Sequence, residues 1–129
     1  MNWAHGVSHI KTLNHIIYIT LEGDFNGDGV IIWIEKVKRI VTDFNGEKFA
    51  ILMDLTRTTG ATPEGFEHSN QYNLWLNNQN LIGKALLYPS DALKNIEKLL
   101  VTNKDNQNIQ NFDGLDGLEQ AEKWLLSLF

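Results

Sequence analysis

The segment Asp24–Glu35 has the residue types and spacing of a calcium-binding loop. It reads Asp-Phe-Asn-Gly-Asp-Gly-Val-Ile-Ile-Trp-Ile-Glu, with a glycine at its sixth position. Oxygen-bearing side chains stand at the first, third, fifth and twelfth positions, which are Asp24, Asn26, Asp28 and Glu35. A loop of this kind holds calcium when a helix lies on each side of it.

The flanking sequence favours a different interpretation of this segment. The residues before it, His15 to Gly23, are β-branched and aromatic, and they predict a strand rather than a helix. Gly27 and Gly29 suit a strand-to-helix turn, and Asp28 can cap the helix that follows. EF-hands usually occur in pairs, and no second loop follows. We therefore expect a structural turn and keep calcium binding as an alternative hypothesis.

Other side chains that could carry catalysis form no recognisable arrangement. The chain has no cysteine, which excludes thiol catalysis, disulfides and cysteine-ligated zinc. Its serines stand in no Gly-x-Ser-x-Gly motif. Its histidines show no metal-binding spacing on a helix; they are His5, His9, His15 and His68. We expect neither an enzyme nor a cofactor.

Composition narrows the classes of partner. The 129 residues predict a single domain over 1–129, and the net charge of −5 with scattered basic residues argues against nucleic acid and anionic membranes. No apolar run approaches the roughly 20 residues of a membrane span. The first residues lack the features of a signal peptide, so we expect a cytoplasmic protein.

Hydrophobic periodicity predicts the elements of the first half. The helix from Val30 to Phe44 has the clearest pattern, with apolar residues at helical spacing, and Asn45-Gly46 suits its C-cap. Before this helix we expect a weak strand Val7–Leu13, a turn at Asn14, a strand Ile16–Leu21 and a loop Gly23–Gly29. After it we expect a strand Phe49–Met53, which is stopped by Asp54, and a polar loop Leu55–Thr62.

The second half predicts three helices that alternate with two strands. Thr62 and Pro63 mark the start of a helix that runs to about Asn80. We then expect a strand Leu81–Tyr88 and a helix that is capped by Ser90, with apolar residues Leu93, Ile96, Leu99 and Leu100. A strand Ile109–Phe112 follows. The last helix begins after a capping box at Asp116–Glu119 and buries Leu118, Ala121, Trp124, Leu125 and Leu128.

The resulting order is β-β-α-β-α-β-α-β-α. This alternation predicts a single-domain α/β fold in which about five strands form a mixed sheet, and about four helices pack against it.

The order of elements and several local strings resemble the SpoIIAA-like (STAS, anti-sigma-factor-antagonist) superfamily. The strings are Leu-Glu-Gly23, Asp54-Leu-Thr56, Ala85-Leu-Leu-Tyr-Pro89, and a tail with Phe112-Asp and Ala121-Glu-Lys-Trp-Leu125, which resembles a largely uncharacterised bacterial group. The resemblance implies a small mixed sheet with packed helices. Its relatives include phospho-regulated antagonists, domains of sulphate transporters and a lipid-carrying group.

The phosphorylation switch of the resembling antagonists does not carry over cleanly. There, an Asp-Ser pair follows the end of the central strand by eight and nine residues, and Thr62 and Pro63 occupy those places here. Pro63 has no hydroxyl group, and Thr62 fits only if the register shifts by one residue. Phosphate is favoured at a helix N-terminus, so Thr62 is a candidate phosphorylation site, with an ordinary N-cap as the alternative.

A partner-binding surface is expected where the strands end. In open α/β sheets ligands gather at the carboxyl ends of the strands, and in the resembling antagonists the loop and helix there bind the partner. If Phe66 and Leu74 are buried, Tyr72 and Trp75 are at least partly exposed and favour an interface; the alternative is that both aromatic residues are core. The candidate partner-binding residues are Asp54, Thr56, Thr58, Thr59, Thr62, Tyr72 and Trp75.

The functional expectation is a regulatory protein–protein interaction or a homodimer. The alternatives are a module that binds a small apolar ligand or a lipid, and calcium binding at 24–35.

Overall fold

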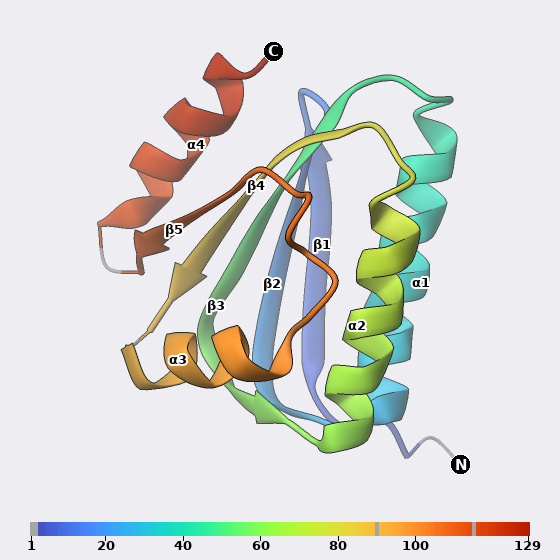
Figure 1. The fold of residues 1–129 in the computed structure, drawn as a ribbon, viewed down its shortest axis with the longest axis vertical. Coiled ribbons are helices and arrows are strands. Elements are labelled where there is room, and N and C mark those ends of the chain that lie inside the picture. Colours follow the sequence, from blue (N-terminus) through green and yellow to red (C-terminus); the bar gives the residue numbers. More distant parts are fainter. Residues whose placement is uncertain (1–2, 90, 115) are drawn as a thin grey trace.

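One five-stranded sheet with helices on both faces forms the framework of the molecule (Figure 1). The computed structural model describes residues 3–89, 91–114 and 116–129, without the side chains of residues 92, 97 and 99. The elements, in the predicted order, are β1 (Val7–Leu13), β2 (Ile16–Phe25), α1 (Gly27–Asp43), β3 (Phe49–Ala61), α2 (Pro63–Leu76), β4 (Leu81–Tyr88), α3 (Asp91–Leu100), β5 (Ile109–Asp113) and α4 (Gly117–Ser127).

The strands lie in the sheet in sequence order, β1-β2-β3-β4-β5. β1 and β2 are antiparallel and are joined by a two-residue turn, in which Asn14 and His15 have φ angles of 54° and 61°. These positive angles are those of the tight turns that match the twist of a hairpin. The other pairs are parallel and connected through α1, α2 and α3. The predicted mixed α/β sheet is therefore confirmed.

Two hydrophobic cores lie on opposite faces of the sheet. The larger core packs α1 and α2 against one face, and the stripe of α1 predicted from periodicity is buried in it. The smaller core packs α4 against the other face, where Ala121 and Leu125 contact Leu52 and Ala85. Among the helices, over the residues that the structure describes, none is long and apolar enough to cross a membrane.

β3 is much longer than predicted, because the polar stretch after Asp54 continues the strand to Ala61. This stretch pairs with the last residues of β2, which continues past the predicted strand to Phe25, so that Glu22 lies opposite Arg57 and Phe25 opposite Ala61. Its threonines are β-branched and suit a strand, although their polarity resembles that of a loop. The predicted loop Leu55–Thr62 is therefore wrong.

The helices also differ from the prediction in their ends and buried faces. α1 begins at Gly27 rather than near Val30, and α2 ends at Leu76 rather than near Asn80. Asp116 makes no side-chain capping bond, so the predicted capping box of α4 is absent. Leu118 was predicted to be buried but is exposed, and the apolar residues Ile96 and Leu100 of α3 are exposed as well. The predicted cap Ser90 and the side chain of Leu99 lie outside the described residues.

Candidate functional site

The calcium-loop segment is a turn from β2 into α1. Asp24 lies in β2, Asp28 and Glu35 lie in α1, and Asn26 stands between the two elements. An EF-hand needs a helix before the loop, and here a strand precedes it. Across the described parts of the chain, no three His, Cys, Asp or Glu side chains lie together as a metal site would require.

The polar residues of this turn cap helix α1 and hold the N-terminal segment close to it. Asn26, rather than the predicted Asp28, is the N-cap of α1, and its Oδ1 accepts from the Gly29 N–H at 2.9 Å. The same oxygen accepts from the His5 N–H at 2.9 Å, and Nδ2 donates to the Trp3 carbonyl at 2.8 Å. A Cβ on Gly29 would lie 1.9 Å from the His5 carbonyl oxygen. Packing of the N-terminal segment therefore explains the glycine.

Asn26→Ala is expected to lower the free energy of unfolding by about 1–2 kcal/mol, because it removes the cap of α1. Asp28→Ala should change it by less than about 0.5 kcal/mol, since Asp28 is exposed and is not the cap. Urea denaturation of both variants checks the pair. A melting temperature that rises with calcium and falls with chelator would contradict the turn interpretation.

On the α4 side, part of the sheet surface is covered by none of the helices that the structure describes. α4 packs on β4, β5 and the first half of β3, which leaves β1, the outer part of β2 and the second half of β3 uncovered (Figure 1). We call this region the open sheet face; the strand register places on it Val7, His9, Lys11, Leu13, Thr20, Glu22, Asp54, Thr56 and Arg57.

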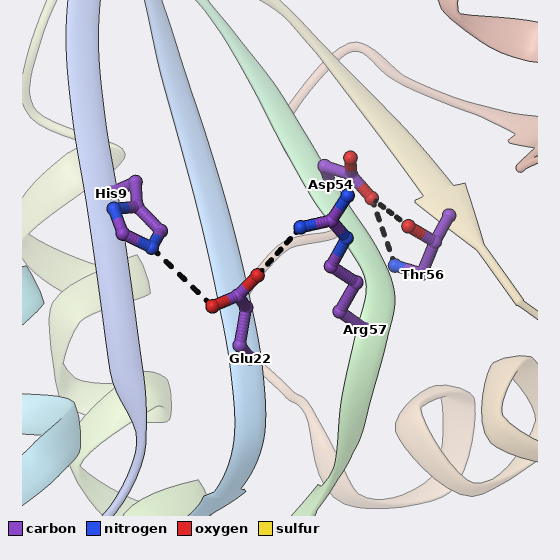
Figure 2. Close-up of polar contacts among 5 residues, drawn as sticks. All are labelled: His9, Glu22, Asp54, Thr56 and Arg57. Carbon is purple, nitrogen blue, oxygen red and sulfur yellow. Dashed lines mark hydrogen bonds and ion pairs between the residues drawn. The ribbon is translucent and has the colours of Figure 1, made fainter.

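A chain of three ionisable side chains crosses the open sheet face from β1 to β3 (Figure 2). Arg57 donates from Nη1 to Glu22 Oε1 at 2.8 Å, and His9 Nε2 lies 3.4 Å from Glu22 Oε2. The hydrogen bond from Arg57, helped by that of His9, holds the pKa of Glu22 below its usual value. Glu22 therefore stabilises the fold above its ordinary pKa, and this contribution is lost as the pH falls through the lowered value. Exposed pairs of this kind add little stability.

Asp54 and Thr56 form a second polar pair on this face, next to Arg57 (Figure 2). Asp54 Oδ1 accepts from the Thr56 N–H at 2.9 Å and from its hydroxyl at 2.6 Å. This side-chain turn follows the last pairing of β3 with β4, at Asp54 and Leu87. The face thus presents fixed donors, acceptors and both signs of charge.

The remaining predicted partner residues are divided between the surface and the interior. Thr59 is exposed and donates to Asp24, and Thr62 is the predicted N-cap of α2, with Oγ1 accepting from the Gly65 N–H at 3.1 Å. Thr58 is buried and donates to the Gly23 carbonyl at 2.9 Å.

The two aromatic residues of α2 differ in exposure, and only Trp75 is partly exposed as predicted. Tyr72 is 5% exposed and Trp75 is half-buried beneath Lys38, whereas Leu74 is 46% exposed. The hypothesis of Phe66 and Leu74 inside with Tyr72 outside is therefore wrong. The buried stripe of α2 contains Tyr72, Asn73 and Leu76, so a polar residue takes a place that the pattern reserved for an apolar one.

Sequence reasoning missed a cavity under the opposite face of the sheet. It has a volume of about 80 Å³ and lies between the sheet, α1, α2 and the segment after α3. Its wall is mainly apolar, but Trp33, Tyr72 and Lys84 also line it. Lys84 is 6% exposed, and its Nζ donates to Asn73 Oδ1 at 3.3 Å. The signal in the sequence was a single lysine within the apolar strand Leu81–Tyr88.

Solved structures share this architecture at low sequence identity. An uncharacterised protein of the DUF3478 family with a SpoIIAA-like fold, from Shewanella loihica, superposes with a TM-score of 0.61 and 12% identity over 97% of each chain. The unphosphorylated anti-sigma factor antagonist SpoIIAA superposes with a TM-score of 0.58 and 11% identity, over 90% of this chain and 98% of that one. No protein-family model and no curated protein matches the sequence. The chain therefore has the SpoIIAA-like fold, as its sequence predicted.

Proposed function

We propose that this SpoIIAA-like domain is a non-enzymatic module that binds a protein partner through its open sheet face. The observation that supports this most directly is the parallel pair of β2 and β3, which is uncovered on one side over its second half. Parallel strands are usually covered on both faces. A partner seated there would supply the missing layer.

The chemistry of the face suits a reversible partner better than a permanent one. Its centre carries Glu22, Asp54 and Arg57, and its apolar residues Val7 and Leu13 stand at the margins. Charged residues are depleted in the centres of obligate interfaces but are common in transient ones, where they select the partner and its orientation. This role is regulatory in kind, and the SpoIIAA protein of similar fold is itself described as an antagonist of an anti-sigma factor.

The proposed regulation does not use the phosphorylation switch. The position matching the antagonist serine is Pro63, at the first turn of α2, and the Thr62 hydroxyl caps that helix. A kinase acting on Thr62 would have to displace the cap before reaching the hydroxyl oxygen.

Arg57→Glu is expected to weaken partner binding strongly, because it reverses the charge beside Glu22 and breaks the Arg57–Glu22 ion pair. Affinity purification of tagged protein from its native cells, followed by quantitative mass spectrometry, measures the effect. A partner should be lost at least about 10-fold with Arg57→Glu. Arg39→Glu on α1 changes the same charge away from the open sheet face, and should retain that partner.

Equal recovery of every protein by the two variants would contradict the proposal. Loss of the protein's own second copy, seen by light scattering as a change from dimer to monomer with Arg57→Glu alone, would identify the partner as the protein itself.

We propose as a second function the binding of a small, largely apolar ligand in the cavity beside Tyr72. The supporting observation is a space of about 80 Å³ that is walled mainly by apolar side chains, since such pockets with a few convergent polar groups are typical ligand sites.

A further inference from the structure

Two residues of the cavity wall carry a buried donor that has no hydrogen-bond partner among the residues that the structure describes. These donors are the indole N–H of Trp33 and the hydroxyl of Tyr72, whose rings meet edge to face with centroids 5.3 Å apart. Trp33 and Tyr72 are 3% and 5% exposed. Leaving such a group unsatisfied is costly, so each donor favours an occupant that accepts a hydrogen bond.

The side chains of Asn73, Thr58 and Ser69 in the wall already have hydrogen-bond partners. Asn73 Oδ1 accepts from Lys84 and from Gln107, and its Nδ2 donates to the Thr102 carbonyl at 2.9 Å. The hydroxyl groups of Thr58 and Ser69 donate to backbone carbonyls. Because the indole can only donate, the hydrogen-bonding capacity that remains is mainly that of donors. A ligand must therefore supply acceptors.

The charge of the wall specifies the acceptor further. Among the described residues that line the cavity, the charged ones are Lys84 and Lys104. The Lys84 Nζ lies 6.0 Å from the centroid of the Tyr72 ring, and that ring meets the Trp33 ring edge to face, so the three residues are neighbours in the cavity wall. Burial raises the pKa of Tyr72, which keeps its hydroxyl protonated as a donor at neutral pH.

We infer that the cavity binds a small monocarboxylate with an apolar body, and that its carboxylate accepts from Trp33, Tyr72 and Lys84. The apolar body would lie among the side chains of Leu55, Phe66 and Leu86. The volume equals about six water-sized sites, which suits a ligand of roughly six to eight non-hydrogen atoms. This inference rests on the second proposed function.

The test is a titration of the full ¹⁵N-labelled chain with sodium hexanoate and, separately, with 1-hexanol. The two probes share an apolar body and differ in the charged head. The chain has four tryptophans, and the indole N–H signal of Trp33 should shift with hexanoate. We expect hexanoate to bind at least about 10-fold more tightly than hexanol, because a hydrogen bond to a charged group is the stronger one.

Substitutions test whether Lys84 causes the preference for hexanoate over hexanol. Lys84→Met should weaken hexanoate binding about 10- to 100-fold and leave hexanol binding within about 3-fold. Lys123→Met, on exposed α4, is the matched control and should change neither. Tyr72→Phe keeps the ring in place, and should weaken hexanoate several-fold even if Lys84→Met fails to fold.

The outcomes separate this inference from the function on which it rests. If hexanol and hexanoate bind equally, the apolar site stands and the carboxylate inference is overturned. If neither probe shifts the Trp33 signal, so that only water occupies the two donors, the carboxylate inference and the proposed ligand-binding function are both overturned.

Discussion

Leu125→Ala is expected to lower the free energy of unfolding by about 3 kcal/mol, within the usual range of about 2–5 for a buried leucine. Leu125 is 0% exposed, and its side chain lies between α4 and the sheet in the smaller core. Truncation of the Leu125 side chain leaves a cavity. α4 cannot easily close it, because few large side chains hold this helix on the sheet. Urea denaturation followed by circular dichroism measures the change.

The neighbouring leucine is the matched control for this prediction. Leu126 is 50% exposed, and Leu126→Ala should cost less than about 0.5 kcal/mol. Equal effects of the two substitutions would mean that α4 is not docked as described. The boundary of the open sheet face would then be wrong, because α4 defines where the covered part of that face ends.

Tyr72→Ala is expected to destabilise the fold by about 3–4 kcal/mol, because it empties an aromatic position in the larger core. The ring of Tyr72 packs edge to face on Trp33 and stacks near Trp75 at 6.2 Å between centroids. Leu74→Ala, on the exposed side of the same helix, should cost less than about 1 kcal/mol. Thermal and urea unfolding of both variants give the comparison.

The reverse order of effects would restore the rejected orientation of α2, with Leu74 inside and Tyr72 available to a partner. Tyr72→Phe adds a sharper control. It keeps the packing and removes the unpaired hydroxyl, so the ligand-free variant should be as stable as the parent or more stable by about 1 kcal/mol.

The order of the elements could be predicted because most of them have clear periodicity or end signals. The apolar stripe of α1 is regular, and Thr62 with Pro63 marks the start of α2. β4 is almost wholly apolar, which is typical of a central parallel strand. These signals are local, so a single sequence suffices to read them.

The length of β3 and the orientation of α2 depend on partners distant in sequence. Residues 55–61 become a strand because β2 continues beside them, which their own polarity does not indicate. α2 buries Asn73 because that amide bonds to Lys84 and to the Thr102 carbonyl, while Leu74 next to it remains exposed. Periodicity cannot anticipate a buried polar network.

The candidate site was predictable only in part for the same reason. Asp54 and Thr56 were singled out, and they lie on the open sheet face beside Arg57 (Figure 2). Glu22 and His9 were not, because only the register of three strands brings them to Arg57. The cavity is lined by residues of six elements, β2, α1, β3, α2, β4 and β5, and has no local signature in the sequence other than Lys84.

Site-specific photo-crosslinking in the native cells tests the central claim most directly. A crosslinking amino acid in place of Lys11, on the open sheet face, should give one discrete protein adduct. The same group in place of Lys36, exposed on α1, should give none. Adducts from position 36 alone, or from neither position, would contradict the proposal that a protein partner covers the open sheet face.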